Sequence, residues 1–243
     1  MIDIHCHILP EVDDGSGSMK ESIHMVEIAI NTGVNEIIAT PHSNIPGSFQ
    51  NYIDTNFFCR FTLLQNEIEK NFLPLQIYPG LEIFCTNKTV DHLLDGSLIT
   101  LNNSRYPLVE FDFTEYSSSC FEKLKKLTAA GFTPIVAHPE RYEFLLDDED
   151  AVGKIKQLGC LIQVNRGSLF GRFGPAAKYN AEKILDYRLA DFIASDAHSP
   201  YMRTTAMDDA YEYICEYYSD DYAELLLEYN PRCVIENKEI TPY

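Results

Sequence analysis

The sequence is short of positive charge. It has 19 lysines and arginines against 37 aspartates and glutamates, which gives 243 residues a formal net charge of −18 and a pI near 4.6. A chain this acidic repels the phosphate backbone of DNA and RNA. The charge balance therefore argues against a nucleic-acid partner.

Long apolar runs and cysteine pairs are also missing. No stretch approaches the roughly 18 apolar residues that a membrane-spanning helix needs. The segment 1–5 lacks the basic and apolar regions of a signal peptide. The seven cysteines are scattered and never spaced C-x-x-C, which argues against a disulfide framework and suits a reducing compartment. We therefore expect a cytoplasmic protein without a membrane span.

Short apolar runs alternate with longer stretches of helical spacing. The runs are mostly rich in Ile and Val, and flanking Gly, Pro and Asn mark them as seven strands: 1–5, 35–40, 76–84, 106–112, 134–138, 160–165 and 191–195. Continuous apolar strands that alternate with helices predict a buried parallel sheet in an α/β protein. Since no linker interrupts the seven units, a closed barrel forming one domain over residues 1–243 is favoured. The alternative is an open doubly wound sheet, but no Gly-rich phosphate-binding turn follows the first strand.

The tyrosine-rich and acidic segment at about 205–243 differs from the rest of the chain. Its pattern predicts a pair of amphipathic helices. A helical cap on the barrel is favoured over a partner-binding surface.

Metal-ligand residue types recur where the predicted strands end. His5 and His7 are two apart, so their side chains share one strand face and can converge on a metal. Carboxyl-terminal strand ends form the active-site rim of barrel enzymes. Imidazole and carboxylate ligands without thiolate suit Mn, Fe or Zn, and paired metals generate hydroxide near neutral pH. Six of the seven strands bring such residues to this rim: His5 and His7, His42, Glu82, Glu110, His138, and Asp196 with His198.

Two carboxylates keep competing interpretations on the residues alone. The Asp-Asp-Gly run at 13–15 is common turn chemistry, yet Asp14 also suits a ligand that folds over the site. Asp112 shares a strand face with Glu110 and competes with it, although Glu110 is preferred.

Several polar residues near these motifs are ambiguous as well. Arg141 and Arg203 closely follow ligand motifs and are either surface residues or a clamp for an anionic group such as phosphate. Glu140 is either a carboxylate supporting the ligands or a surface residue. His24 and His92 lie away from strand ends, so structural or surface roles are expected for both.

One motif suggests a different chemistry. Cys160 and Arg166 have the C-x5-R spacing of cysteine-dependent phosphatases, in which a thiolate attacks phosphorus. The intervening residues form a predicted buried strand without the glycine that a phosphate-binding loop needs. Burial would raise the pKa of the Cys160 thiol, so this interpretation is disfavoured.

As an ordered set, these segments resemble the polymerase-and-histidinol-phosphatase (PHP) superfamily. Within it, the chain resembles the bacterial manganese-dependent protein-tyrosine phosphatases of capsular and exopolysaccharide synthesis. The resemblance reaches to about residue 205 and is weakest in the C-terminal tail. It is carried by MIDIHCHILP at 1–10, DDG at 13–15, IATPH at 38–42, PGLEI at 79–83, LVEF at 108–111, VAHPER at 136–141, GSL at 167–169 and ASDAH at 194–198.

The resemblance implies a distorted parallel (β/α)7 TIM-like barrel of PHP type that holds three divalent ions, Mn foremost, with Fe or Zn as alternatives. It assigns His5, His7, Glu82 and Asp196 to the first ion. It assigns Glu82, as a bridge, with Glu110 and His138 to the second ion. The third would be held by Asp14, His42 and His198, and the substrate phosphate by Arg141 and Arg203.

The implied activity is hydrolysis of phosphotyrosine in protein, in the tail of a bacterial tyrosine kinase that controls polysaccharide export. Two alternatives stay open. One is a small-molecule hydrolase, either a histidinol-phosphate-like phosphatase or an amidohydrolase-type metal enzyme. The other is a regulatory module that binds the kinase tail without turnover, and an oligomer is compatible with each. Tyr142, and Asn165 with Arg166, depart from the family pattern near the rim and concern substrate preference.

Overall fold

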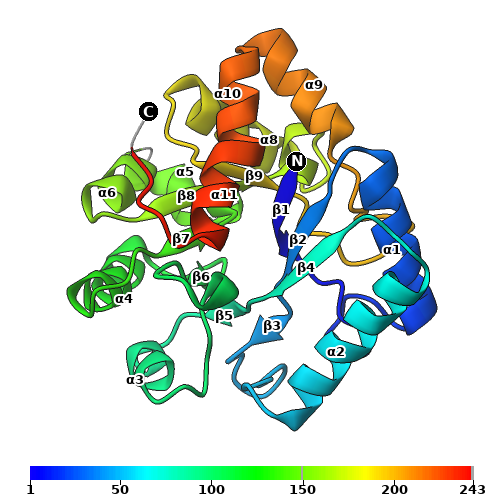
Figure 1. The fold of residues 1–243 in the computed structure, drawn as a ribbon. Helices are drawn as coiled ribbons and strands as arrows, with labels where there is room; N and C mark the ends of the chain where they lie inside the picture. Colours follow the sequence, from blue (N-terminus) through cyan, green and yellow to red (C-terminus); the bar gives the residue numbers. More distant parts are fainter. Residues whose placement is uncertain (149, 242–243) are drawn as a thin grey trace.

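A ring of short parallel strands surrounded by helices forms the centre of the computed structural model, which describes residues 1–148 and 150–241 (Figure 1). The strands form two parallel sheets. One sheet contains β1 (Ile2–Cys6), β2 (Glu36–Ala39) and β4 (Gln76–Pro79). The other contains, in order, β3 (His42–Ser43), β5 (Glu82–Phe84), β6 (Leu108–Glu110), β7 (Ile135–Ala137), β8 (Leu161–Asn165) and β9 (Phe192–Ala194).

The two sheets join into a seven-membered barrel. Along the chain, β2 is continued by β3, and β4 is continued by β5. Because β2 pairs with β4 and β3 pairs with β5, these four segments form two long barrel strands that lie side by side. On the other side β1 meets β9, where the backbone N–H of Asp196 donates to His5 O at 2.9 Å and that of His7 donates to Ala197 O at 2.9 Å. The predicted parallel α/β barrel is therefore confirmed, and its strands follow one another around the barrel in chain order.

The prediction of one strand over 76–84 is wrong in detail, because the chain breaks between β4 and β5 at Gly80. A Cβ built on Gly80 would lie 2.8 Å from Ile38 Cγ2 and 3.0 Å from Leu101 Cδ2. The chain thus passes too close to its neighbours for a side chain at this bend. The short strand β3 was not predicted, and it forms where the chain continues in the direction of β2 past Pro41.

Replacing Gly80 by alanine should destabilise the fold by about 1–3 kcal/mol, because the new methyl group overpacks a closed core. Thermal denaturation would measure this as a lowered midpoint. Gly153→Ala is the matched control, since a Cβ there meets no atom within 4 Å. Alanine is also favoured in a helix by about 0.5–1 kcal/mol, so the control should leave stability equal or higher. Equal midpoints for Gly80→Ala and wild type would contradict the packing argument.

Helices fill the connections between the strands and cover the outside of the barrel (Figure 1). Side-chain caps start two of them: Ser18 accepts from the Glu21 N–H and Asp54 from the Phe57 N–H. The helices are α1 (Met19–Asn31), α2 (Thr55–Lys70), α3 (Thr89–Leu94), α4 (Ser117–Ala129), α5 (Phe144–Asp147), α6 (Ala151–Gln157), α7 (Arg166–Leu169) and α8 (Pro175–Asp186). The single turn η1 (Leu101–Asn103) lies between α3 and β6, and the single turn η2 (Pro139–Arg141) follows β7.

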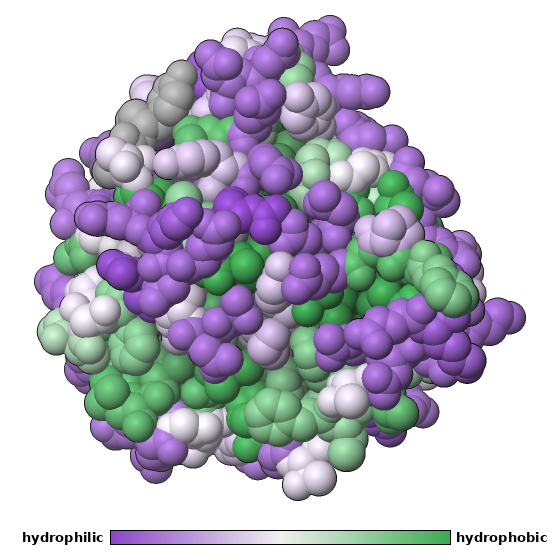
Figure 2. Space-filling view, viewed as in Figure 1, coloured by the Kyte–Doolittle hydropathy of each residue, from purple (hydrophilic) through white to green (hydrophobic). Residues whose placement is uncertain are grey.

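The C-terminal segment forms α9 (Asp208–Tyr217), α10 (Asp220–Glu224), the wider turn η3 (Leu225–Tyr229) and α11 (Asn230–Ile235). In Figure 1 the red helix α11 crosses in front of the strands. Its Cys233 and Val234 share an apolar cluster with Ile2 and Ile4 of β1. This cluster fills the amino-terminal half of the barrel, so the polar site residues gather at the other end. Figure 2 shows mainly hydrophilic residues over α9 and α10 on the outer surface.

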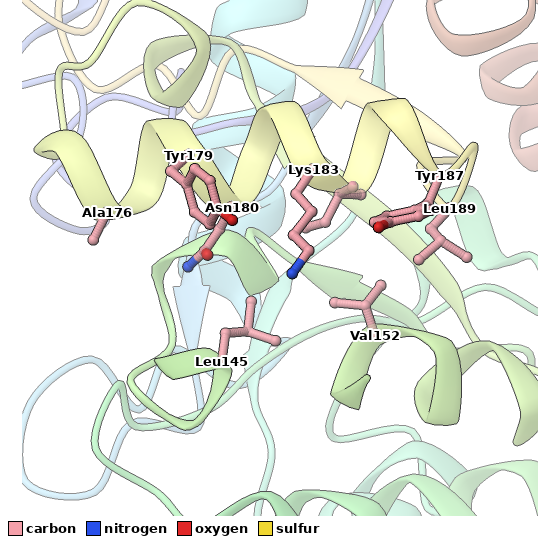
Figure 3. Close-up of a pocket in the computed structure, with 9 residues that line it drawn as sticks. Leu145, Val152, Ala176, Tyr179, Asn180, Lys183, Tyr187 and Leu189 are labelled. Atoms are coloured by element: carbon pink, nitrogen blue, oxygen red, sulfur yellow. The ribbon is translucent and has the colours of Figure 1, made fainter. Parts of the chain in front are cut away.

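The hollow shown in Figure 3 lies outside the barrel, between α8 and the α5–α6 segment. It has a volume of about 150 Å³, and Tyr179, Lys183 and Leu145 are among its lining residues. None of the predicted site residues lines it. In the part of the chain that the structure describes, no helix has the length and apolar character needed to cross a membrane.

Candidate metal centre

The nine predicted ligands meet at the carboxyl end of the barrel. Their donor atoms form overlapping groups whose members lie within 4.8 Å of one another. The groups are His5, His7 and Asp196; His42, Glu82 and Glu110; and His7, Asp14, His42 and His198. The remaining residue, His138, joins through Glu82. The alternation of side chains along β1 and the shared rim of parallel strands explain this convergence.

Glu82 lies at the centre of the cluster. Its Oε1 is 3.2 Å from His5 Nε2 and 2.9 Å from His138 Nε2. Its Oε2 is 3.2 Å from His7 Nε2 and 2.9 Å from His42 Nδ1. One fully buried carboxylate therefore faces four imidazoles, which is the arrangement expected of a ligand that bridges two cations.

The structure places differently the carboxylates whose interpretation the residues alone left open. Glu110 is buried and its Oε1 lies 3.0 Å from His42 Nδ1, whereas Asp112 is exposed and accepts hydrogen bonds from Thr114 in a turn. Asp14 Oδ1 lies 3.6 Å from the Nε2 atoms of both His42 and His198. Its side chain is 55% exposed, so Asp14 closes the site from the solvent side.

Two of the candidate ligands occupy left-handed backbone conformations. His138, directly after β7, has φ of 36°, and Asp196, two residues after the end of β9, has φ of 48°. Such conformations cost a non-glycine residue roughly 1–3 kcal/mol and concentrate at functional sites. Here they turn the chain sharply at the strand end, which places both side chains over the barrel mouth.

The donor set fits divalent cations. Within residues 1–148 and 150–241, the buried atoms His42 Nδ1, Glu82 Oε2 and His198 Nε2 make no aligned hydrogen bond, even though the first two lie 2.9 Å apart. Buried polar atoms normally have a partner. A cation that accepts these lone pairs would satisfy them, and imidazole with carboxylate suits Mn, Fe or Zn.

The protonation states of the imidazoles are split within the cluster. Burial opposes charge on His42, but Glu82 and Glu110 outweigh it and raise the pKa of His42 to about 10. Burial lowers the pKa of His138 to about 4 and the pKa of His198 to about 2. His138 and His198 therefore present neutral nitrogens, while a cation bound at His42 must displace a proton.

Polar residues outside the predicted ligand set orient the histidines. His5 Nδ1 lies 2.9 Å from Gln163 Oε1, and Gln163 Nε2 donates to Asn165 Oδ1 at 2.8 Å. Asn165 Nδ2 in turn donates to Asp196 Oδ2 at 2.5 Å. These contacts fix the His5 tautomer so that Nε2 faces the cluster, as supporting hydrogen bonds do in metal sites. The available signal was Gln163 and Asn165 on one face of an otherwise apolar strand.

Asp13 orients a second histidine, His7, in the same way. Its Oδ2 lies 2.7 Å from His7 Nδ1 and accepts the backbone N–H of His42 at 2.8 Å. The neighbouring Asp14 faces the cluster directly. The Asp-Asp-Gly turn thus supplies one orienting carboxylate and one candidate ligand, while Gly15 packs against His7 so closely that a Cβ would lie 2.3 Å from His7 O.

Replacing Gln163 by leucine should weaken divalent-metal affinity by about 10–100-fold, because it releases His5 Nδ1 and frees the ring to turn. Competition of the metal-loaded protein with a chelator measures this directly. Asn230→Ala is the control, since it removes another buried amide, one that donates to Asp191 O at 2.9 Å and lies outside the cluster. An unchanged metal affinity in Gln163→Leu would contradict the orienting role.

Both predicted arginines border the cluster and converge on one ligand. Arg203 Nη2 lies 2.5 Å from Asp196 Oδ2 and its Nε donates to Asp196 O at 3.1 Å. Arg141 Nη1 lies 3.4 Å from the same Oδ2. The other oxygen of Asp196, Oδ1, faces His5 and His7 at 3.5 Å each. Asp196 therefore ties the two guanidinium groups to the candidate metal positions.

The cysteine-dependent alternative is not supported by the geometry. Cys160 is buried just before β8, at the amino-terminal end of the barrel, and burial raises the pKa of its thiol to about 12. Arg166 is engaged by Asp209 through Nε at 2.6 Å and Nη2 at 2.5 Å. The two residues of the C-x5-R motif thus lie at opposite ends of one strand.

The remaining ambiguous residues lie outside the donor groups. Glu140 is buried and accepts from Ser168 Oγ at 2.6 Å and from the Asn165 N–H at 3.0 Å, so it supports the rim. His24 lies beside Tyr201, and His92 lies on α3. Neither histidine belongs to a donor group among the described residues.

Comparison with known proteins relates the whole chain to one group of enzymes. A family model described as "Capsular polysaccharide synthesis, CpsB/CapC" matches residues 1–236. The tyrosine-protein phosphatase CpsB of Streptococcus agalactiae is 33% identical over 245 residues, which cover 99% of this chain and 100% of that protein.

Solved structures extend the comparison to the fold. A chain from the crystal structures of Bacillus subtilis YwqE and Streptococcus pneumoniae CpsB, described as unique metal-dependent tyrosine phosphatases, matches with a TM-score of 0.93 and 30% identity. The match covers 100% of this chain and 97% of that chain. Histidinol phosphate phosphatase from Lactococcus lactis, solved with zinc, L-histidinol and phosphate, has a TM-score of 0.55 at 13% identity over 93% of this chain and 94% of that chain. This second likeness concerns the fold alone.

Proposed function

This chain belongs to the CpsB/CapC family of capsular polysaccharide synthesis, and from that premise we propose how its site carries out the family's reaction. The protein is a metal-dependent tyrosine-protein phosphatase, as its relatives are. The observation that carries the proposal is the convergence of nine imidazole and carboxylate side chains beside two arginines that share Asp196.

We propose that the cluster holds three divalent ions, foremost Mn, with Fe or Zn as alternatives. The first would be held by His5, His7, Glu82 and Asp196, the second by Glu82, Glu110 and His138, and the third by Asp14, His42 and His198. The ions supply Lewis acidity and lower the pKa of water, so that hydroxide is available near neutral pH. They also offset the −18 charge of the chain where an anionic substrate must bind.

The arginines bind the phosphoryl group in this proposal. Arg203 is held by two contacts to Asp196, and Arg141 reaches the same carboxylate from η2. Guanidinium groups suit the non-bridging phosphoryl oxygens, whose charge they stabilise during an in-line displacement. Because a phenolate with a pKa near 10 leaves more readily than an alkoxide, the site needs no strong general acid. Direct in-line attack of hydroxide on phosphorus would need no covalent phosphoenzyme.

The substrate class follows from the family, and the finer details are proposals. We propose that the phosphotyrosine lies in the tail of a bacterial tyrosine kinase that controls capsular or exopolysaccharide synthesis. A cytoplasmic location suits such a substrate, and the seven free cysteines fit a reducing compartment. We further propose that residues 1–243 act as one catalytic domain, with about 205–243 as its helical cap.

A substrate panel tests this function. The Mn-loaded protein should hydrolyse a phosphotyrosyl peptide with a kcat/KM well above that for histidinol phosphate, and it should leave a β-aspartyl dipeptide intact. A preference for the small phosphomonoester would favour the metabolite phosphatase, and dipeptide cleavage would favour an amidohydrolase-type enzyme.

A variant tests the non-enzymatic alternative. His138→Ala removes one candidate ligand, so turnover of the phosphotyrosyl peptide should fall sharply if the protein is an enzyme. A regulatory module would bind the peptide and show no turnover to lose, in wild type or variant. Peptide binding measured beside turnover in both proteins separates these two cases.

A further inference from the structure

Two phenylalanine rings enclose the guanidinium group of Arg141. Its Cζ lies 4.4 Å from the centre of the Phe113 ring and 4.2 Å from the centre of the Phe173 ring. Within residues 1–148 and 150–241, the guanidinium has one polar contact, the 3.4 Å approach of Nη1 to Asp196 Oδ2. Aromatic stacking, more than hydrogen bonding, therefore sets the orientation of Arg141.

Phe173 also reaches the second arginine. The Cζ of Arg203 lies 5.5 Å from the centre of the same ring, which is within the range of a cation–π interaction. The Phe173 ring thus contacts both guanidinium groups, whereas the Phe113 ring contacts only that of Arg141 among these two arginines.

The backbone around Phe173 fixes the position of its ring. A Cβ built on Gly167 would lie 2.9 Å from Phe173 Cε2, so the ring packs directly on the backbone of α7. The Arg172 N–H donates to Gly167 O at 2.9 Å, and the Gly174 N–H donates to Gly171 O at 3.1 Å, which ties the loop into two successive turns. Packing on Gly167 and the two turns therefore fix the position of the Phe173 ring in the absence of substrate.

We propose that Phe173 is a positioning residue, which holds Arg141 and Arg203 side by side so that their free N–H groups face one phosphoryl dianion. Stacking leaves the edges of a guanidinium available for hydrogen bonds while it restricts rotation. A pre-oriented pair loses less entropy on binding than two mobile side chains. This inference rests on the proposed function, because it assumes that the two arginines bind the phosphoryl group.

Binding of inorganic phosphate to the Mn-loaded protein, measured by calorimetry, tests the proposal without turnover. Phe173→Ala should weaken phosphate binding by at least about tenfold, and Phe113→Ala should weaken it by less. Phe170→Ala is the matched control, since this neighbouring ring is 47% exposed and lies over Arg166, 5.8 Å from its Cζ. The control should bind phosphate as wild type does. Wild-type affinity in Phe173→Ala would overturn the proposal.

Two further variants separate positioning from general packing. Phe173→Leu keeps apolar volume against Gly167 but removes the aromatic face, so it should also bind phosphate weakly, whereas Phe173→Tyr should retain affinity. Wild-type affinity in Phe173→Leu would overturn the proposal even if the alanine variant failed to fold.

A double-mutant cycle asks whether Phe173 acts through Arg141. In an Arg141→Ala background, Phe173→Ala should cost at most about threefold, because only the contact to Arg203 remains. An undiminished tenfold loss in that background would contradict positioning. If wild type binds phosphate in the expected pattern but does not hydrolyse a phosphotyrosyl peptide, the proposed function fails while the positioning role stands.

Discussion

Replacing Glu82 by glutamine should lower kcat/KM for a phosphotyrosyl peptide by about 10³-fold or more, the largest loss expected of any single substitution here. The amide keeps the size of the side chain but loses the charge and one acceptor oxygen. Because the carboxylate faces His5, His7, His42 and His138 at 2.9–3.2 Å, its loss removes the proposed bridge and leaves four imidazoles without their common counter-charge. Elemental analysis should therefore show a lower metal content together with the lost activity.

Glu36→Gln is the matched control for this experiment. Glu36 is also a buried carboxylate on a barrel strand, but it begins β2 at the opposite end and pairs with Arg232 and Tyr78. Its substitution should reduce stability and leave metal content and kcat/KM near wild type. If Glu82→Gln retained both metal and activity, the bridging role would be refuted. If both variants lost metal equally, general destabilisation would explain the result.

The barrel and most of the candidate ligands could be predicted because both depend on local patterns, whereas Asp14 was assigned only through the family resemblance. Apolar runs of strand length predict the barrel strands. The residues at the carboxyl ends of those strands must then meet at one rim of the barrel. The H-x-H pair at His5 and His7 needs only the alternation of a strand to share a face. The structure brings all nine candidates together, while their roles as ligands stay a proposal.

What the sequence could not predict depends on contacts between distant segments. The break at Gly80 arises from Ile38 and Leu101, which are 42 and 21 residues away in the chain. Likewise, nothing in the sequence near Phe173 indicates that its ring lies against Arg141 and Arg203. Gln163 was missed for the same reason, since its function is a hydrogen bond to His5, 158 residues away in the chain. Asp13 lies close to His7 in the chain, and the conformation of the turn decides that Asp13 rather than Asp14 meets the Nδ1 atom of that ring.

Removing divalent metal should abolish phosphatase activity, whereas replacing the cysteine of the C-x5-R motif should not. After treatment with a chelator, kcat/KM for a phosphotyrosyl peptide should fall by about 10³-fold or more, because Lewis acidity and activated water are lost together. Adding Mn²⁺ should restore it. Cys160→Ser should stay within about twofold of wild type, because its thiol is buried, has a pKa raised to about 12 and lies at the amino-terminal end of the barrel.

The two treatments distinguish a metal-dependent displacement from thiolate attack. The first mechanism requires the metal and not the Cys160 thiol, and the second requires the thiol and not the metal. A cysteine-dependent enzyme would survive the chelator and lose all activity in Cys160→Ser. Cys120→Ser is the control for the loss of a buried thiol, since burial raises the pKa of Cys120 to about 12 as well and the residue belongs to no phosphatase motif. Full activity after chelation, with the metal shown to be absent, would refute the mechanism proposed for this site. Activity that follows metal content, and is indifferent to both serine variants, would place hydrolysis at the nine-residue cluster around Glu82.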